Sequence, residues 1–254
     1  MIKLKKQLFL FFIVFFVFSF YNNSVDTKNI TMNVLERIIF IKYNDHYGTG
    51  FTIEVNNKQY IITAKHVVEG IKQNDSIFVF NNNQWKETNV KNIQFKEPEI
   101  DAIALVPSIQ LTPVTNIQFS MDSMVLGQDV YFFGFPFGLR TDVGSLNNNF
   151  PIAFIKKGII SSIDTKNPEI KVIWIDGYSN PGFSGGPIIF EDIFTENFKI
   201  AGVLAGHINE RIDVMGEKDK TELYVQINGG LIYSIGIGSI IKLIKENQEK
   251  LNEN

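Results

Sequence analysis

A single serine stands among glycines and prolines in the stretch Asn180-Pro181-Gly182-Phe183-Ser184-Gly185-Gly186-Pro187. Glycine lets a backbone adopt positive φ and approach another backbone closely, and proline fixes φ. A serine on such a stiff turn can present its hydroxyl, while the peptide N–H groups of Gly182 and Ser184 can point into one small space. A nucleophile beside donors for a developing oxyanion is what acyl transfer needs. An ordinary glycine-rich turn between strands is the alternative for this stretch taken alone.

A serine nucleophile needs a base, and the base needs an acid to orient it. The chain has three histidines, and one of them, His66, lies at the end of an apolar run that indicates a strand. Asp101 begins a second apolar run, and an aspartate leading into a buried strand needs a partner. Each residue alone is explained by a core histidine or a strand-end cap. In the order His66, Asp101, Ser184 they predict a catalytic triad.

The order and surroundings of these residues resemble the trypsin-like (chymotrypsin-fold) serine proteases, and more narrowly the HtrA/DegP type. The resemblance covers nearly everything after residue 33 and rests on several segments in the same order. The similar segments are 48–53, 60–68, 101–105, 131–139, 157–162 and 176–187.

The resemblance implies a role for each residue of the site. Ser184 attacks the scissile carbonyl, His66 takes the proton and returns it to the leaving amine, and Asp101 holds the imidazole. The N–H groups of Gly182 and Ser184 bind the oxyanion. No metal or organic cofactor is needed, and the expected partners are polypeptide substrates.

Length and composition bound the remaining possibilities. The chain has 254 residues, 44% of them hydrophobic, with a net charge of −3 and no cysteine. One globular domain or a closely fused pair is therefore expected. The absence of cysteine excludes a disulfide framework and a thiolate metal site. The weakly acidic balance gives no sign of a nucleic-acid partner.

Short apolar runs at regular spacing predict an all-β fold. The first group of expected strands is 34–41, 50–55, 59–63, 76–80, 88–94 and 103–106. The second group is 129–133, 152–163, 171–175, 187–190, 200–205 and 231–237. The resemblance turns these into two six-stranded antiparallel β-barrels, about 33–118 and 124–238, with the active site between them. An amphipathic pattern predicts a short C-terminal helix over 239–250, with Ser239 as its N-cap.

The N-terminal segment 1–24 has the pattern of a targeting sequence. Three lysines precede an apolar run over residues 8–20, which is short for a membrane span and fits a signal peptide. An uncleaved membrane anchor and a buried segment remain alternatives. The positive-inside rule places the rest of the chain outside the cytoplasm. Residues 25–32 are expected to be a linker and 33–250 a protease domain, without the PDZ domain that usually follows in HtrA-type proteins.

The resemblance places a substrate pocket beside the nucleophile loop. Its expected base and walls are Tyr178, Ser179, Ala205, Gly206 and His207, with the strand near residues 233–236. No carboxylate lies among them, and burying an unpaired cation is costly. We therefore expect small or medium uncharged side chains at the cleavage site.

Phe183 departs from the family pattern. Digestive trypsins carry Asp at this position and HtrA-type enzymes usually carry Asn. In digestive trypsins this Asp pairs with the N-terminus that activation cleavage frees. Phenylalanine cannot form that ion pair, so the sequence leaves open what fixes the oxyanion loop. The main hypothesis is a serine endopeptidase in extracytoplasmic quality control or processing. The alternatives are a catalytically silent trypsin-fold binding module and a membrane-anchored scaffold.

Overall fold

The computed structural model describes residues 30–216 and 220–252. The predicted targeting segment 1–24 and most of the linker 25–32 lie outside the described residues. Within the described part, no helix has the length and apolar character that crossing a membrane requires. All the strands and helices described below belong to one unit, Thr31–Asn254.

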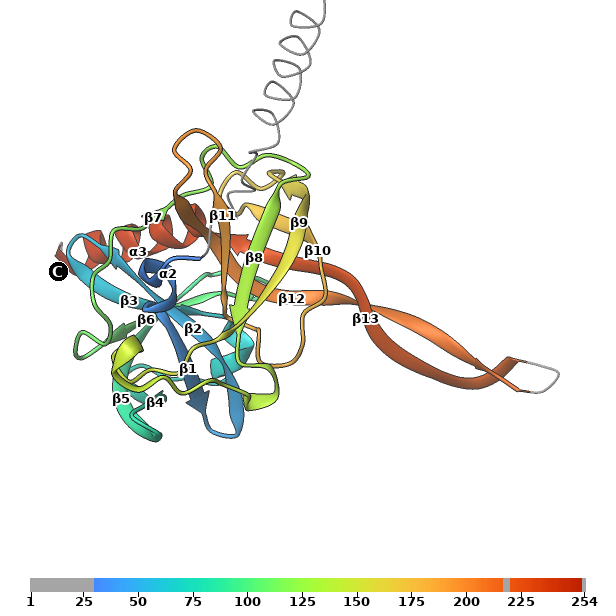
Figure 1. Cartoon of the computed structure of the whole chain (residues 1–254), viewed down its shortest axis with the longest axis horizontal. Helices are drawn as coiled ribbons and strands as arrows, with labels where there is room; N and C mark the ends of the chain where they lie inside the picture. Colours follow the sequence, from blue (N-terminus) through green and yellow to red (C-terminus); the bar gives the residue numbers. More distant parts are fainter. Residues whose placement is uncertain (1–29, 217–219, 253–254) are drawn as a thin grey trace, which may run out of the picture. The chain divides into compact units, whose positions relative to one another are not determined.

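The first barrel is closed and antiparallel, with the strand order β1-β2-β3-β6-β5-β4 (Figure 1). A short helix, α2 (Met32–Leu35), precedes it, and the 3-10 helix η1 (Lys65–Val68) follows its third strand. The strands are β1 (Ile38–Tyr43), β2 (His46–Val55), β3 (Lys58–Thr63), β4 (Asp75–Asn81), β5 (Gln84–Gln94) and β6 (Ile103–Pro107).

Asparagine pairs close two of the hairpins in this barrel. Asn56 and Asn57 join β2 to β3 with φ of 50° and 59°, and Asn82 and Asn83 join β4 to β5 with φ of 54° and 57°. Two consecutive positive φ values match the twist of a two-residue hairpin, and asparagine tolerates them better than most residues do. The first turn sets the register of β2 and β3, the strands that lead to the site, and the second sets that of β4 and β5.

The second sheet also closes on itself. Its order is β11-β8-β9-β10-β13-β12-β7, and β11 pairs with β12 as well. The strands are β7 (Gln118–Phe119), β8 (Asp129–Gly134), β9 (Phe154–Asp164), β10 (Val172–Asp176), β11 (Pro187–Glu191), β12 (Phe198–Met215) and β13 (Lys220–Gly236). The remaining elements are η2 (Pro136–Gly138), η3 (Gly144–Asn147) and α3 (Ile237–Asn252). The predicted all-β double barrel with a C-terminal helix is confirmed.

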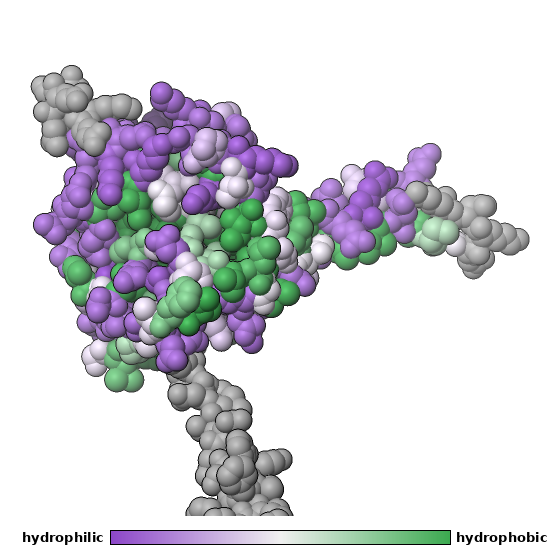
Figure 2. Space-filling view, turned by 90° about the horizontal axis from the view of Figure 1, so that it is seen from above, coloured by the Kyte–Doolittle hydropathy of each residue, from purple (hydrophilic) through white to green (hydrophobic). Residues whose placement is uncertain are grey.

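The prediction was wrong about three local features. Val34 lies in α2, and the first strand begins only at Ile38. Helix α3 begins at Ile237, so Ser239 is no N-cap; instead its hydroxyl accepts the N–H of Lys171 at 3.2 Å. Strands β12 and β13 run far beyond the expected 200–205 and 231–237, and form a long hairpin that extends from the barrel strands (Figures 1 and 2).

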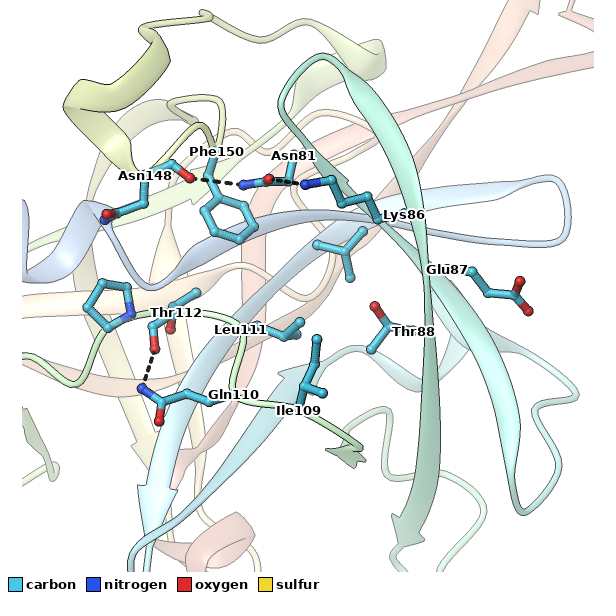
Figure 3. Close-up of a pocket in the computed structure, with 12 residues that line it drawn as sticks. Asn81, Lys86, Glu87, Thr88, Ile109, Gln110, Leu111, Thr112, Asn148 and Phe150 are labelled. Carbon is cyan, nitrogen blue, oxygen red and sulfur yellow. Dashed lines mark hydrogen bonds between the residues drawn. The ribbon is translucent and has the colours of Figure 1, made fainter.

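A cavity of about 580 Å³ lies beside the first barrel (Figure 3). Residues of β4, β5 and the segment 109–113 line it. Lys86 Nζ donates to Asn81 Oδ1 at 2.7 Å, and Asn81 Nδ2 donates to the carbonyl of Asn148 at 3.0 Å. None of the predicted catalytic residues lines this cavity, so it is not where the chemistry is expected.

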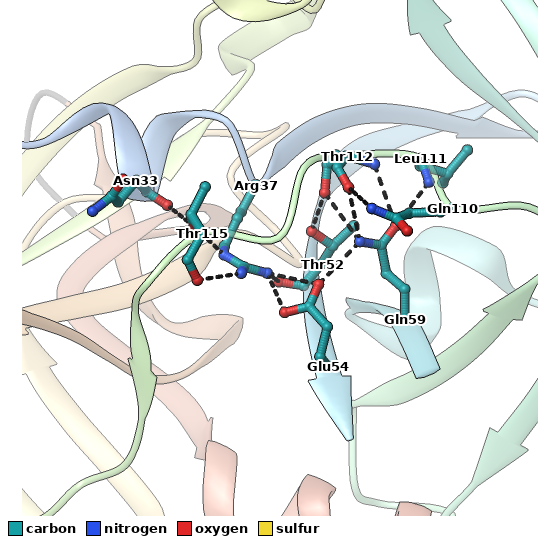
Figure 4. A network of polar contacts seen from close by, with 9 residues as sticks. All are labelled: Asn33, Arg37, Thr52, Glu54, Gln59, Gln110, Leu111, Thr112 and Thr115. Carbon is teal, nitrogen blue, oxygen red and sulfur yellow. Dashed lines mark hydrogen bonds and ion pairs between the residues drawn. The ribbon is translucent and has the colours of Figure 1, made fainter. Parts of the chain in front are cut away.

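A buried arginine joins the segment between the barrels to the first barrel (Figure 4). Arg37 has no exposed surface, and its Nη1 donates to both carboxylate oxygens of Glu54, at 3.0 and 2.7 Å. Its Nε and Nη2 donate to Thr115 Oγ1 and the Thr115 carbonyl, at 2.7 and 2.8 Å. A buried charge needs such partners on every side. The sequence analysis missed this network because its residues lie far apart in the chain.

A second buried ion pair closes the turn between β11 and β12. Asp192 pairs with Lys199 and accepts the Ser123 hydroxyl at 2.6 Å and the N–H of Phe194 at 2.7 Å. The bond from Lys199, then those from Ser123 and Phe194, hold the pKa of Asp192 well below its usual range. The turn is therefore stabilised by an ionised carboxylate.

We expect Asp192→Asn to lower the melting temperature near neutral pH. The folded-state pKa of Asp192 lies below that of an unfolded aspartate, about 3.9. The carboxylate therefore stabilises the fold above that pH, and its contribution disappears as the pH falls through lower values. The melting-temperature gap between wild type and variant, measured by calorimetry, should shrink below about pH 4. Asp129→Asn, which removes an exposed pair with Lys157, is the control and should change little. A gap that is undiminished in acid would contradict this assignment.

Candidate active site

His66 and Asp101 meet because their strands are neighbours. Thr63 at the end of β3 pairs with Ile103 at the start of β6, so the segments that carry the two residues begin side by side. The main-chain N–H of His66 donates to Asp101 Oδ1 at 2.9 Å, and His66 Nδ1 lies 2.6 Å from Asp101 Oδ2. Two bonds to one carboxylate fix both the backbone and the ring of His66.

The nucleophile loop is a pair of tight turns that require glycine. Gly182 and Gly185 have φ of 98° and 84°. A Cβ on Gly182 would lie 2.1 Å from the carbonyl oxygen of Phe135, and a Cβ on Gly185 would lie 2.1 Å from that of Thr49. Any other residue would both strain the backbone and collide with it. The loop is packed this tightly around Ser184, which is itself half-buried.

Both barrels hold the loop. Thr49 in β2 donates its N–H to the Ser184 carbonyl at 2.9 Å and its hydroxyl to the Gly182 carbonyl at 2.7 Å. On the other side, Gly185 donates to the carbonyl of Leu204 in β12, and Leu204 donates to the carbonyl of Gly186, each at 2.8 Å. The serine therefore lies between a strand of the first barrel and a strand of the second.

The N–H groups predicted for the oxyanion remain available. The carbonyl of Pro181 accepts from Phe137 at 2.9 Å, and that of Phe183 accepts from Gly186 at 2.9 Å. In a trans peptide the N–H points away from the carbonyl, so those of Gly182 and Ser184 are directed away from these partners. In the described part of the chain, neither N–H donates to a protein acceptor. Backbone donors left without a protein partner suit a ligand oxygen.

Phe183 anchors the loop by burial. Its side chain is fully buried and packs edge-on against Phe132, with ring centroids 5.6 Å apart. A Cβ on Gly134 would lie 2.6 Å from the Cα of Phe183, so glycine there makes room for it. A hydrophobic anchor therefore holds the nucleophile loop at Phe183.

Lys156 in β9 is a residue of the site that the sequence analysis missed. Its Nζ donates to the Tyr178 carbonyl at 2.7 Å and to Asn180 Oδ1 at 2.5 Å. It also lies 5.2 Å from the ring centre of Tyr178 and 5.3 Å from that of Phe183. Burial lowers the pKa of this ammonium. The alternation of β9 was the available signal, because one of the two adjacent lysines had to face inward.

The structure brings part of the predicted pocket together. Ser179 is buried, and its Oγ lies 3.3 Å from His207 Nδ1. Ala205 is buried, and the ring of Tyr233 covers Gly206, where a Cβ would meet it at 2.8 Å. Tyr178 is 54% exposed, and its ring lies near Lys156. Tyr178 is therefore the one predicted pocket residue that stands largely in solvent.

Two hollows lie near the predicted catalytic residues and the nucleophile loop. One, of about 430 Å³, is lined by His66, Asp101 and neighbouring residues of the first barrel. The other, of about 510 Å³, lies against Gly182 and is lined by aromatic residues that include Tyr47, Trp85 and Phe137. The described hydrogen bonds include none between Ser184 Oγ and the His66 ring.

Comparison with protein families assigns the chain. A model of the trypsin-like peptidase domain matches residues 48–192, more than half of the chain. The chain belongs to the trypsin-like peptidases. It is accordingly a serine-type endopeptidase by family. A search of curated proteins found no match.

Solved structures share the fold of this peptidase. The inactive form of Rv3671c from M. tuberculosis, with a serine-to-alanine substitution, is 17% identical with a TM-score of 0.54, over 89% of this chain and 93% of that one. The active form is 19% identical with a TM-score of 0.53, over 84% and 81%. An HtrA-type protease, an AlgW variant with a tripeptide, is 17% identical with a TM-score of 0.53, over 85% and 63%.

We expect Phe183→Ala to destabilise the peptidase by about 3–5 kcal/mol, because the buried ring would leave a cavity beneath the nucleophile loop. Thermal unfolding measures the loss. Phe154→Ala, which removes a 42% exposed ring from β9, is the matched control and should cost much less. Equal losses in the two variants would show that Phe183 is no anchor.

Proposed function

We propose that this peptidase hydrolyses peptide bonds in polypeptide substrates with Ser184 as nucleophile, His66 as general base and acid, and Asp101 as the orienting carboxylate. The observation that carries the proposal is the double hydrogen bond between Asp101 and His66, 2.9 and 2.6 Å long. A carboxylate that accepts the proton of Nδ1 leaves Nε2 as the basic atom, facing away from Asp101. No cofactor takes part in this mechanism.

The proposed steps follow the positions of the groups. Ser184 Oγ adds to the scissile carbonyl while His66 takes its proton, and the N–H groups of Gly182 and Ser184 stabilise the oxyanion. His66 then protonates the leaving amine, and water completes hydrolysis by the same route. The substrate side chain on the acyl side would enter the pocket between Ser179 and the wall Ala205, Gly206 and His207. The lack of a Ser184–His66 bond is compatible with this mechanism, because such bonds often tighten only with substrate.

A catalytically silent binding module is the second candidate, since no hydrogen bond joins Ser184 Oγ to His66 in the described part of the chain. A fluorophosphonate probe separates the two candidates, because only an activated serine reacts with it.

The triad is tested by cleavage of casein with residues 30–254 and by labelling with the probe. Ser184→Ala and His66→Ala should each lower the rate by several orders of magnitude, up to about a millionfold, and the double variant should lose little more. Ser161→Ala, at an exposed serine of β9, is the control and should keep full activity. Substantial activity in Ser184→Ala would reject the assignment.

Cleavage of a peptide library by the same protein tests which side chains the predicted pocket accepts. We expect cleavage after small or medium uncharged residues, because no carboxylate among the pocket residues can pair with a buried lysine or arginine. A profile dominated by basic residues would mean that the pocket lies elsewhere, while leaving the triad intact.

We also propose that the peptidase acts outside the cytoplasm, in protein quality control or processing. The support is the basic start and the apolar run over residues 8–20, a pattern typical of a signal peptide or a membrane anchor. A reporter that works only outside the cytoplasm, fused after residue 30, should be active. Activity of a cytoplasm-only reporter at the same position would refute the export.

A further inference from the structure

Strands β12 and β13 continue beyond the second barrel as a two-stranded arm, described over residues 208–215 and 220–230. The pairing of β12 with β11 ends at Val203, opposite Pro187, whereas its pairing with β13 continues from Asn209–Asn228 to Met215–Lys220. Figure 1 shows the arm extending away from the other strands of the sheet. A two-stranded hairpin without a third strand is marginally stable in water, so a long arm of this kind suggests a partner.

One edge of β12 is open along the inner half of the arm. Over residues 205–212 the described backbone pairs with β13 on one side and with no strand on the other. No proline interrupts this stretch. An exposed strand edge of this kind presents N–H and C=O groups that accept an added strand.

The two faces of the arm differ in chemistry. Ile212 lies opposite Val225, and Glu210 lies opposite Ile227, so the three apolar side chains share a face with the Glu210 carboxylate. They are 42%, 49% and 41% exposed, respectively. On the other face, the Cζ atom of Arg211 lies 4.0 Å from the centre of the Tyr224 ring, and its Nε lies 3.4 Å from Asp213 Oδ1. Figure 2 shows hydrophilic and hydrophobic residues along different borders of the arm.

The open edge is continuous with the nucleophile loop. Leu204, in the same strand, exchanges two hydrogen bonds of 2.8 Å with Gly185 and Gly186. The predicted pocket wall, Ala205, Gly206 and His207, follows directly, and the arm follows the wall. A chain lying along residues 205–212 would cover roughly 25 Å without leaving the strand.

We propose that the arm is an exosite for unfolded polypeptide, binding the part of the substrate that precedes the scissile bond. An antiparallel strand added to β12, which runs away from the nucleophile, would have its N-terminal residues on the arm and its carbonyl end at Ser184. Alternate apolar side chains of this strand lie beside Ile212 in β12, and Val225 and Ile227 in β13 extend that apolar face one strand further. The inference rests on the proposed function, and it extends the substrate contact beyond the pocket wall to Ile208 and the residues after it. The substrates that the arm would bind are extended polypeptide segments with alternating apolar residues.

The test uses residues 30–254 and three peptides that share one cleaved core. The first is the core alone, the second adds eight residues of alternating valine and serine before the core, and the third adds them after it. The N-terminal extension should raise kcat/KM by about tenfold, mainly through KM, because it buries apolar side chains on the arm. The C-terminal extension should give much less.

Matched variants locate the effect. Ile212→Ser combined with Val225→Ser should abolish the gain from the N-terminal extension and leave cleavage of the core peptide unchanged. Gln226→Ser, on the polar face, should keep the gain. A gain that survives the apolar-face variant, or one that is absent in the wild type while the core is cleaved, would overturn the exosite and leave the triad untouched.

A binding measurement separates this inference from the proposed function. The valine–serine segment alone, labelled with a fluorophore, should bind Ser184→Ala protein and lose affinity in the apolar-face variant. Such binding without any peptide hydrolysis by the wild type would support the arm and reject the triad. Two other outcomes would show that the arm serves another partner. In one, the apolar-face variant changes a dimeric wild type into a monomer in sedimentation; in the other, it no longer binds anionic vesicles that the wild type binds. If either occurs while binding of the valine–serine segment is unchanged, the proposal fails.

Discussion

The arrangement of this peptidase depends on a backbone contact between β2 and the nucleophile loop. Thr49 bonds to the carbonyls of both Ser184 and Gly182, at 2.9 and 2.7 Å, and its own carbonyl leaves no room for a Cβ on Gly185. His66 and Asp101 belong to the first barrel and Ser184 to the second. Gly185 has no side chain to hold the loop away from Thr49. The loop and β2 therefore approach each other more closely than they would with any other residue at position 185. Their separation, and with it the geometry of the site, is set there.

The nucleophile loop is anchored to the second barrel without a carboxylate. Phe183 is buried against Phe132, while Lys156 bonds to the Tyr178 carbonyl and to Asn180. Burial disfavours the charge on Lys156, which is why its pKa is lowered, and the two oxygens and two ring faces offset that cost. Dispersion and ion–dipole contacts thus hold the loop together.

The sequence predicted the parts of the fold that local patterns determine. Short apolar runs at regular spacing marked the barrel strands, and the surroundings of His66, Asp101 and Ser184 marked the segments that meet at the site. Long-range polar pairing left no such mark: Arg37 meets Thr115 78 positions away, and no local pattern in the sequence joins the two. The arm was missed for a different reason. Its residues are exposed on both faces, so their alternation lacked the contrast with a buried core on which strand prediction depends.

Strand β12 connects the separate parts of the molecule. Its first residues close the second barrel against β11, Leu204 supports the nucleophile loop, and the later residues form the arm with β13. Register shifts at Leu204–Gly206 and His207–Asn209 separate these parts. A bulge bends a strand and increases its twist, so the arm can leave the barrel without disturbing the pairing that holds Ser184. We therefore expect a substitution in the arm to affect the open edge of β12 rather than the barrel core. Most core residues of this strand precede the register shift at Leu204–Gly206.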